Sequence, residues 1–246
     1  ILYTKDYPYE SCITSTGKTH FDIFAKSVVE SFNIIKDDLV IDIGSNVGVL
    51  LSGFKKRGCE VLGFDPAENI ALIAQKNGIP TIPTFFNSKK AEEALKNNKK
   101  AKVITASNVF AHIDDLIDLM KGVDMMLDDD DGVFIIEAPY FQHLLENLEY
   151  DTIYHEHLSY LSLLPLIPFF QNIGFQLFDV KQMDIHGGSI RMFVCRQGNR
   201  KVTKIVNEMV KLEVNKKIHQ IENLMNFSKR ILKNREDLCT LLWSLK

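Results

Sequence analysis

Residues 40–51 constrain the fold more than any other stretch of this chain. An apolar run carrying Asp42 leads into a loop with Gly44 and Gly48 four residues apart, and apolar residues then resume at helical spacing. This pattern is typical of a buried parallel strand that turns into a helix at the edge of an α/β sheet. Small residues let such a loop approach a ligand closely, and the helix N-terminus offers unpaired N–H groups. We therefore expect an α/β fold with a ligand-binding loop here.

The rest of the chain continues the alternation of strands and helices. Its apolar runs predict five alternating strands and a late pair, at 39–43, 59–64, 81–84, 102–106, 133–136, 175–184 and 189–196. The predicted helices are one opening at Thr19 or His20, one ending near Arg57, and those at 67–77, 91–98, 116–127, 165–174 and 202–246. This order predicts a doubly wound, mostly parallel seven-stranded sheet rather than a barrel. We divide the chain into an N-terminal segment and helix lining the site (1–35), a ligand-binding domain (36–200) and a helical C-terminal extension (201–246).

Composition narrows the class of protein. The 246 residues carry a formal net charge of -3, with 25% charged residues and no basic tail, which argues against a nucleic-acid surface. No apolar run reaches membrane-spanning length, and no signal peptide opens the chain. The four cysteines are far apart, which signals neither a zinc site nor a disulfide framework; they are Cys12, Cys59, Cys195 and Cys239. We expect a cytoplasmic protein that acts on a small molecule, without a metal.

The glycine spacing indicates the type of ligand. A dinucleotide fingerprint needs glycine at three places that here hold Gly44, Asn46 and Val49, so that pattern fails. The loop instead resembles the acid-x-Gly-x-Gly-x-Gly loop of class I S-adenosylmethionine (SAM) methyltransferases, with Asn46 at the middle glycine. Asn tolerates a left-handed backbone better than most residues. In that family the loop lies against the methionine part of SAM; a tight strand–helix turn without a ligand is the alternative.

Asp65 is the second signal. It ends the second predicted strand, about 20 residues after the glycine loop, where nucleotide-binding sheets bind ribose hydroxyls. A helix N-cap before Pro66 is the alternative, and both roles can coexist. Phe86 and Asn87 follow the third strand and would suit an adenine ring, although ordinary core packing explains Phe86 equally well.

The exits of the later strands add further polar groups. Asn108 and His112 follow the fourth strand, where side chains point into the ligand crevice, so that Asn108 could satisfy the cofactor and His112 could face the substrate. A structural histidine is the alternative for His112. The acidic run 128–131 lacks the interleaved spacing of a calcium loop, and we interpret it as a solvated turn.

The segment 151–160 is the third signal, because it gathers Tyr154, His155, Glu156, His157 and Tyr160. Metal ligation by the His-x-His pair is one interpretation, but neither helical zinc spacing nor a local cysteine supports it. General acid–base chemistry fits better, since histidine titrates near operating pH, a carboxylate can orient it and a phenol can donate to an oxyanion. A polar helix cap is the structural alternative.

Six motifs together resemble the SAM-dependent sugar C-methyltransferases, which act on nucleotide-linked keto-deoxysugars; they are 7–11, 42–51, 108–112, 137–140, 151–160 and 186–191. The resemblance implies a Rossmann-like class I methyltransferase fold whose late strand pair is antiparallel. It also implies that His157 removes the proton beside the sugar ketone, that Glu156 orients it or holds a hydroxyl, and that Tyr154 and Tyr9 line the pocket.

The remaining site residues follow from their positions at the strand ends and from the same resemblance. Cofactor contacts are expected from Asp42, Gly44, Ser45, Asn46, Gly48, Asp65, Phe86, Asn87 and Asn108. Substrate contacts are expected from His112, His155, Tyr160, His186, Ser189 and Arg191. Arg191 suits a diphosphate because its guanidinium matches phosphate geometry. A core-strand position is the alternative for Arg191, because apolar residues alternate around it.

The chain also departs from the family pattern. Family members carry an N-terminal zinc module and a C-terminal α/β lobe, and neither is recognisable between Ile1 and Lys246. We expect no zinc, and a C-terminal helical tail that is exposed or forms oligomers. Val47 stands where the family often has an acid. An O- or N-methyltransferase and a non-catalytic SAM-binding module therefore remain as alternative functions.

Overall fold

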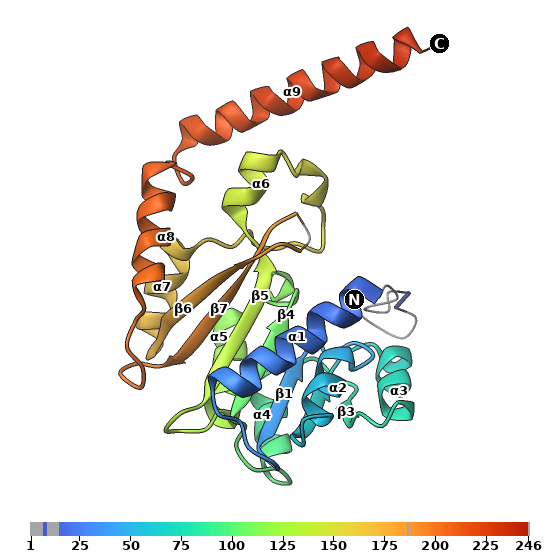
Figure 1. Ribbon diagram of the computed structural model, residues 1–246, viewed down its shortest axis with the longest axis vertical. Helices are drawn as coiled ribbons and strands as arrows, with labels where there is room; N and C mark the ends of the chain where they lie inside the picture. The colour runs from blue at the N-terminus through green and yellow to red at the C-terminus, as the bar shows by residue number, and fades with distance from the viewer. Residues whose placement is uncertain (1–6, 9–14, 186, 246) are drawn as a thin grey trace.

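The structure is a computed structural model that describes residues 7–8, 15–185 and 187–245. A seven-stranded sheet forms its centre, in the order β3-β2-β1-β4-β5-β7-β6 (Figure 1). The strands are β1 (Leu39–Ile43), β2 (Glu60–Phe64), β3 (Thr81–Ile82), β4 (Val103–Ser107), β5 (Val133–Pro139), β6 (Phe175–Met183) and β7 (Ser189–Arg196). The first five strands pair in parallel, while β7 runs antiparallel to β5 and β6. The predicted doubly wound, mostly parallel sheet with an antiparallel late pair is confirmed.

Helices cover both faces of the sheet. The helical elements are α1 (Ser15–Ser31), α2 (Val49–Lys55), α3 (Glu68–Lys76), α4 (Ser88–Leu95), η1 (Phe110–His112), α5 (Leu116–Met126), α6 (Phe141–Asn147), η2 (Tyr150–Thr152), α7 (Leu163–Asn172), α8 (Lys204–Asn215) and α9 (Ile221–Ser244). Residues of α1, α2 and α3 pack on one face around Val40, Val103 and Ile135. Residues of α4, α5, α7 and α8 pack on the other face around Ile41 and Ile104. Because neighbouring residues of each strand enter opposite layers, the strands are apolar on both faces, as buried parallel strands are.

Several predicted boundaries differ from those in the structure. The first helix begins at Ser15, ahead of the predicted Thr19 or His20. Helix α4 begins at Ser88, ahead of the predicted position 91, because the Asn87 side chain accepts from the Lys90 amide and caps it. Strand β5 extends beyond the predicted 136 because it pairs with β7 as far as Pro139.

The C-terminal extension is two helices, where the sequence pattern predicted a single one over 202–246. Lys217 has a φ of 54°, which a continuous α-helix does not allow, so α8 and α9 are separate. Glu213 in α8 is fully buried and accepts hydrogen bonds from the Leu163 and Leu164 amides at the start of α7 (2.7 and 2.9 Å) and from the Tyr140 hydroxyl (2.7 Å). This carboxylate therefore caps a helix of the main fold and joins α8 to it. The three-part division of the chain stays a prediction.

Candidate functional site: the carboxyl edge of the sheet

The glycine loop between β1 and α2 has the backbone that its sequence predicts. Gly44, Asn46 and Gly48 have φ angles of 70°, 48° and 79°, all in the left-handed region. The expectation that Asn46 replaces a glycine by tolerating this conformation is confirmed. A Cβ on Gly44 would come within 2.3 Å of Val109 Cγ2, and one on Gly48 within 2.8 Å of Ile79 Cγ1. The loop is thus closely packed against its neighbours and leaves no room for larger residues at either glycine.

Asp42 lies beneath this loop and is 4% exposed. Its carboxylate accepts a hydrogen bond from the Thr105 hydroxyl at 2.6 Å. Burial raises the pKa of Asp42 to about 7, against the opposing effect of Thr105, and the nearby charge of Asp65 adds to the rise. An ionised carboxylate here would be stabilised by a cationic ligand, and SAM carries positive charge on its sulfonium and amino groups.

Asp65 joins the second strand to the glycine loop. Its carboxylate oxygens accept from the Asn46 amide at 2.9 Å and the Ala67 amide at 3.0 Å. Burial raises its pKa, while these two amides lower it. Asp65 therefore fixes the glycine loop through the Asn46 amide. It also accepts a hydrogen bond from the amide of Ala67, which is the N-cap residue of α3. The two amides hold the carboxylate in place. Ribose binding by Asp65 stays a prediction.

Three buried polar atoms near the carboxyl ends of β1 and β4 have no hydrogen-bond partner among the described residues. They are Ser45 Oγ, Ser107 Oγ and Asn108 Oδ1. Asn108 has a φ of 55°, a left-handed conformation that costs free energy and is common at functional sites. Buried polar atoms usually have hydrogen-bond partners. Atoms without one, beside a loop that leaves no room for side chains, fit a site where a polar cofactor supplies the missing partners.

A second segment, which we name the histidine strap (residues 150–160), lies on the exit of β4. The Leu158 and Ser159 amides donate to the Ala111 carbonyl at 2.9 and 3.2 Å. His112 Nδ1 donates to the Glu156 carbonyl at 2.5 Å. Because Val109 packs on Gly44 in the same β4 exit, the strap and the glycine loop share one edge of the sheet. The sequence motifs around His157 and Gly44 are therefore brought together.

His157 has a defined tautomer in the strap. Its Nδ1 lies 2.7 Å from the Thr152 carbonyl, which can only accept, so Nδ1 carries the proton and Nε2 is the basic nitrogen. The ring is surrounded by aromatic residues, with centroids of Tyr154, His112 and Tyr160 at 4.5, 5.0 and 6.0 Å. Burial lowers the pKa of His112, and a positive charge on His157 would lower it further, so the His112 ring is neutral near pH 7.

The chain that forms this edge matches a known protein family. A model described as a methyltransferase domain matches residues 24–180, which is more than half of the chain. The chain belongs to this methyltransferase family. A second model, described as a C-methyltransferase C-terminal domain, matches residues 184–246. The cofactor of this methyltransferase domain is S-adenosyl-L-methionine.

Relatives agree with this assignment. The C-methyltransferase NovU of Streptomyces niveus is 39% identical over 183 residues, which cover 74% of this chain and 43% of NovU. The chain thus spans less than half the length of that relative. Magnesium protoporphyrin IX methyltransferase of Synechocystis PCC 6803 shares the fold, with a TM-score of 0.55 at 16% identity over 73% of this chain and 83% of that one. A SAM-dependent methyltransferase of Clostridium acetobutylicum ATCC 824 does so with a TM-score of 0.55 at 15% identity, over 74% of this chain and 92% of that one.

Some residues expected at the methyltransferase site have structural partners. Phe86 is buried and makes an edge contact with Phe64 at 4.9 Å, and the Asn87 side chain caps α4. The ring exposed at this position is Phe85, at 51%. The geometry supports the core alternative for Phe86, and the adenine contact of Phe86 and Asn87 stays a prediction.

Arg191 is also placed in the core of the methyltransferase domain. It is 3% exposed, donates to Glu137 at 2.8 Å, and lies 3.3 Å above the Phe24 ring. Burial would raise the pKa of Glu137, but His20, whose Nε2 lies 2.6 Å away, and Arg191 hold it below its usual value. Sequence reasoning missed this network, which joins α1 to the sheet. It favours the core-strand alternative for Arg191, and a phosphate contact stays a prediction.

The other substrate-side residues divide into three groups. His155 is exposed on the strap. Ser189 is buried, and its hydroxyl donates to the Ile185 carbonyl at 3.0 Å, so its sugar contact is a prediction that this geometry does not favour. Tyr9 and His186 lie outside the described residues.

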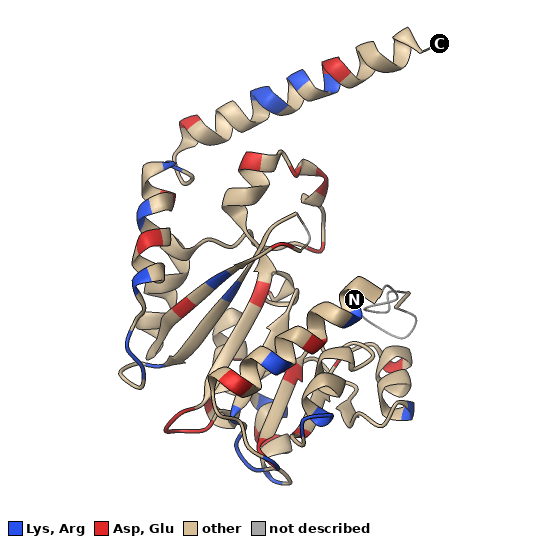
Figure 2. Ribbon diagram, in the orientation of Figure 1, with Lys and Arg blue, Asp and Glu red and all other residues tan. Residues whose placement is uncertain are grey.

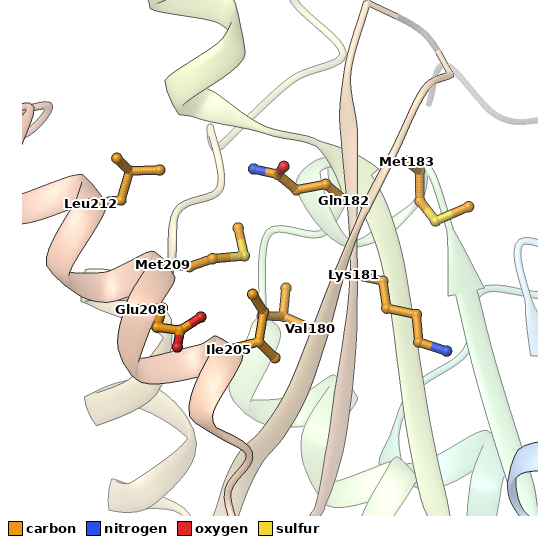
Figure 3. Close-up of a pocket in the computed structure, with 8 residues that line it drawn as sticks. All are labelled: Val180, Lys181, Gln182, Met183, Ile205, Glu208, Met209 and Leu212. Carbon is orange, nitrogen blue, oxygen red and sulfur yellow. The ribbon is translucent and has the colours of Figure 1, made fainter.

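The remaining features lie away from this edge. A cavity of about 630 Å³ opens between α8 and β6 (Figure 3), and it is lined by Val180, Lys181, Gln182, Met183, Ile205, Glu208, Met209 and Leu212. Since β6 is the outer strand on the far side of β5 and β7 from the glycine loop, this cavity is not the cofactor site. The acidic run 128–131 forms ion pairs with Lys100, Lys102 and Arg196 (Figure 2). Within the described ranges, no helix has the length and apolarity to cross a membrane, and no three potential ligands converge on a metal position.

Proposed function

We propose that this methyltransferase domain methylates a carbon atom next to the ketone of a nucleotide-linked keto-deoxysugar, with His157 as the base. The observation that carries the proposal is the hydrogen bond from His157 Nδ1 to the Thr152 carbonyl, because it leaves Nε2 as a proton acceptor on the edge of the sheet that holds the glycine loop. A reaction at carbon needs such a base, since the proton beside a ketone must be removed before the carbon can attack.

The cofactor would lie against residues that the fold has already ordered. We assign its methionine part to the glycine loop above Asp42, its ribose to Asp65, and further polar contacts to Asn108. When bound, it supplies an electrophilic methyl group. The negative charge of Asp42 favours a cationic ligand. Because the pKa of Asp42 is raised, the affinity for such a ligand should depend on pH.

The strap would act on the substrate. The C–H bond beside the ketone breaks, its proton moves to His157 Nε2, and its electron pair forms the enolate. Tyr154 and Tyr160, which surround the ring, can donate hydrogen bonds to the oxygen where negative charge develops. The neutral His112 beside His157 avoids a second positive charge that would oppose protonation of the base. Holding the reacting carbon against the methyl group contributes the remaining rate acceleration.

Similarity to NovU, named as a C-methyltransferase, supports transfer to carbon. The match of residues 184–246 to a C-methyltransferase model supports the same reaction class. Because the chain spans 43% of NovU, the substrate class and the activity of the whole enzyme are part of the proposal.

Hydrogen exchange without the cofactor tests the assigned base. A nucleoside-diphosphate-linked keto-deoxyhexose incubated with the protein in deuterium oxide should take up deuterium at the carbon beside the ketone. His157→Asn should slow this exchange about 10²- to 10⁴-fold. His219→Asn, at an exposed position between α8 and α9, is the matched control and should leave the rate unchanged.

Two results would contradict the proposal. Methyl transfer that persists in His157→Asn, without deuterium uptake by either form, would identify an O- or N-methyltransferase. Calorimetry that shows SAM binding but no binding of the nucleotide-sugar would instead identify a SAM-binding module without this activity.

A further inference from the structure

Helix α9 packs on α6, the helix that leads into the histidine strap (Figure 1). Arg230 of α9 donates to the Leu145 and Glu146 carbonyls at 2.7 Å each. The last carbonyls of a helix have no partner within it, so the Arg230 guanidinium caps the C-terminal end of α6. Phe227 of α9 is buried in one apolar cluster with Leu144 and Leu145. These contacts fix the point at which α6 ends and the chain turns towards the strap.

Helix α9 also contacts both ends of the histidine strap. The hydroxyl of Tyr150, the first residue of the strap, donates to Asn234 Oδ1 at 3.3 Å. Tyr160, the last residue of the strap, packs against the apolar cluster that contains Phe227, as does Ile231 of α9. A segment with several exposed side chains is thus tied at each end to a helix more than 60 residues further along the chain.

A short series of hydrogen bonds joins the capped end of α6 to the His157 ring. The Glu149 amide donates to the Leu144 carbonyl at 3.0 Å. The Glu149 carbonyl accepts from the amide and from the hydroxyl of Thr152, at 3.2 and 2.7 Å. The Thr152 carbonyl is in turn the acceptor for His157 Nδ1. The group that sets the tautomer of His157 is therefore held in place by the end of α6.

We propose that Arg230 is a positioning residue for the histidine strap. By capping α6 from α9, it keeps the Thr152 carbonyl against His157 Nδ1 and so keeps Nε2 as the proton acceptor. Its hydrogen bonds go to two carbonyls of α6, so it acts on His157 through that helix. Without the cap the end of α6 can shift, and a displacement of about 1 Å at a reacting group can slow a reaction about 10²-fold. The importance of Arg230 for catalysis rests on the proposed function, in which His157 is the base.

Nitrogen-15 NMR of the His157 ring tests the positioning directly, because the shifts of the two ring nitrogens distinguish the Nδ1–H from the Nε2–H tautomer. At about pH 9, well above the ordinary pKa of histidine, the parent should show the Nδ1–H form. Arg230→Met keeps the apolar stem but removes both donors, and should give a mixture of the two forms. Arg230→Lys should restore the parent form, since an ammonium group can donate to the same carbonyls. Arg235→Met, at an exposed position of α9, is the matched control and should leave the tautomer unchanged.

Deuterium exchange into the keto-sugar gives the functional measurement for the same variants. Arg230→Met should slow the cofactor-free exchange about 10- to 10²-fold, and Arg230→Lys should recover most of the rate. Affinity for SAM, measured by calorimetry, should stay unchanged, because the glycine loop lies outside these contacts. Asn234→Ala removes the hydrogen bond to Tyr150 and leaves the cap intact, so it should slow the exchange by a smaller factor. Arg230 and Asn234 are exposed, so circular dichroism should show an unchanged fold.

The two measurements separate this inference from the proposed base. An unchanged His157 tautomer in folded Arg230→Met would overturn the role of Arg230, even with a parent that exchanges deuterium. An exchange rate in Arg230→Met equal to that of an active parent would overturn it too. A tautomer that changes in Arg230→Met, together with a parent that takes up no deuterium, would support the positioning of the ring by α9 and overturn His157 as the base.

Discussion

The glycine loop and the histidine strap share one edge of the sheet but are built in opposite ways. The carboxylates beneath the loop are buried, with Asp42 and Asp65 4 and 7% exposed. The strap instead exposes several of its side chains, with Tyr154 and Leu158 at 47 and 56%. Close packing of the sheet fixes the loop, whereas a few backbone hydrogen bonds hold the strap on Ala111 and His112.

This difference separates the energetics of the two halves of the site. Substitutions in the loop should change the stability of the domain and its affinity for the cofactor together. Substitutions in the strap should change catalysis while leaving stability and cofactor affinity nearly intact, because exposed side chains contribute little to folding. Four measurements test this contrast.

The largest effect is expected from Asp42→Asn. The pKa of Asp42 is raised from 3.8 to about 7 in the folded domain, so its contribution to stability is present below about pH 4 and lost as the pH rises towards 7. Asn keeps the acceptor for Thr105 without the charge. Chemical denaturation should therefore show Asp42→Asn more stable than the parent by about 2–4 kcal/mol at pH 8, with little difference at pH 4.

The strap supplies the control for that measurement. Asp151 is an exposed carboxylate of the strap, and Asp151→Asn should change the free energy of unfolding by less than about 0.5 kcal/mol at either pH. Equal pH profiles for the two variants would show that the halves of the site do not differ in this way.

Gly44→Ala should destabilise the domain by about 3 kcal/mol, through left-handed backbone strain and a clash with Val109. Gly174 has a similar φ of 79° but no atom within 4 Å of an added Cβ, so Gly174→Ala isolates the strain at about 1 kcal/mol. Thermal and urea unfolding measure both. Equal losses would mean that Val109 does not hold the loop closely.

His112→Ala should lower turnover about 10²-fold, because it removes the hydrogen bond that holds Glu156 and the ring beside His157. Affinity for SAM, measured by calorimetry, should stay within about twofold of the parent value. A matching loss of affinity would show that the strap also holds the cofactor, and the contrast between the halves would fail.

The smallest effect concerns the conformation of Asn46. Asn46→Ala should cost about 1 kcal/mol, since alanine is strained at a φ of 48°, whereas Asn46→Gly should be nearly neutral. Denaturation midpoints of the two variants provide the comparison. Equal costs would assign the effect to the lost Asn46 side chain rather than to the backbone.

The same contrast explains what the sequence could reveal. The glycine loop and the alternation of strands and helices could be predicted, because spacing and apolar runs are local signals. The strap motif was recognisable, but its docking on Ala111 was not, because that contact joins segments more than 40 residues apart. The His20–Glu137–Arg191 network spans 117 and 54 residues, so a local pattern could not decide between a diphosphate contact and a core position for Arg191. Asn87 and the break at Lys217 depend on single side chains and dihedral angles, which periodicity does not show.

The two C-terminal helices differ in how they are attached to the fold, because the buried Glu213 belongs to α8. If the buried Glu213 carboxylate moved away, the Leu163 and Leu164 amides and the Tyr140 hydroxyl would lose their hydrogen-bond acceptor, which costs free energy. A protease that cuts the 216–220 connection should therefore release α9 and leave α8 in place. A chain truncated after α8 should therefore keep the Glu213 contacts and lose α9.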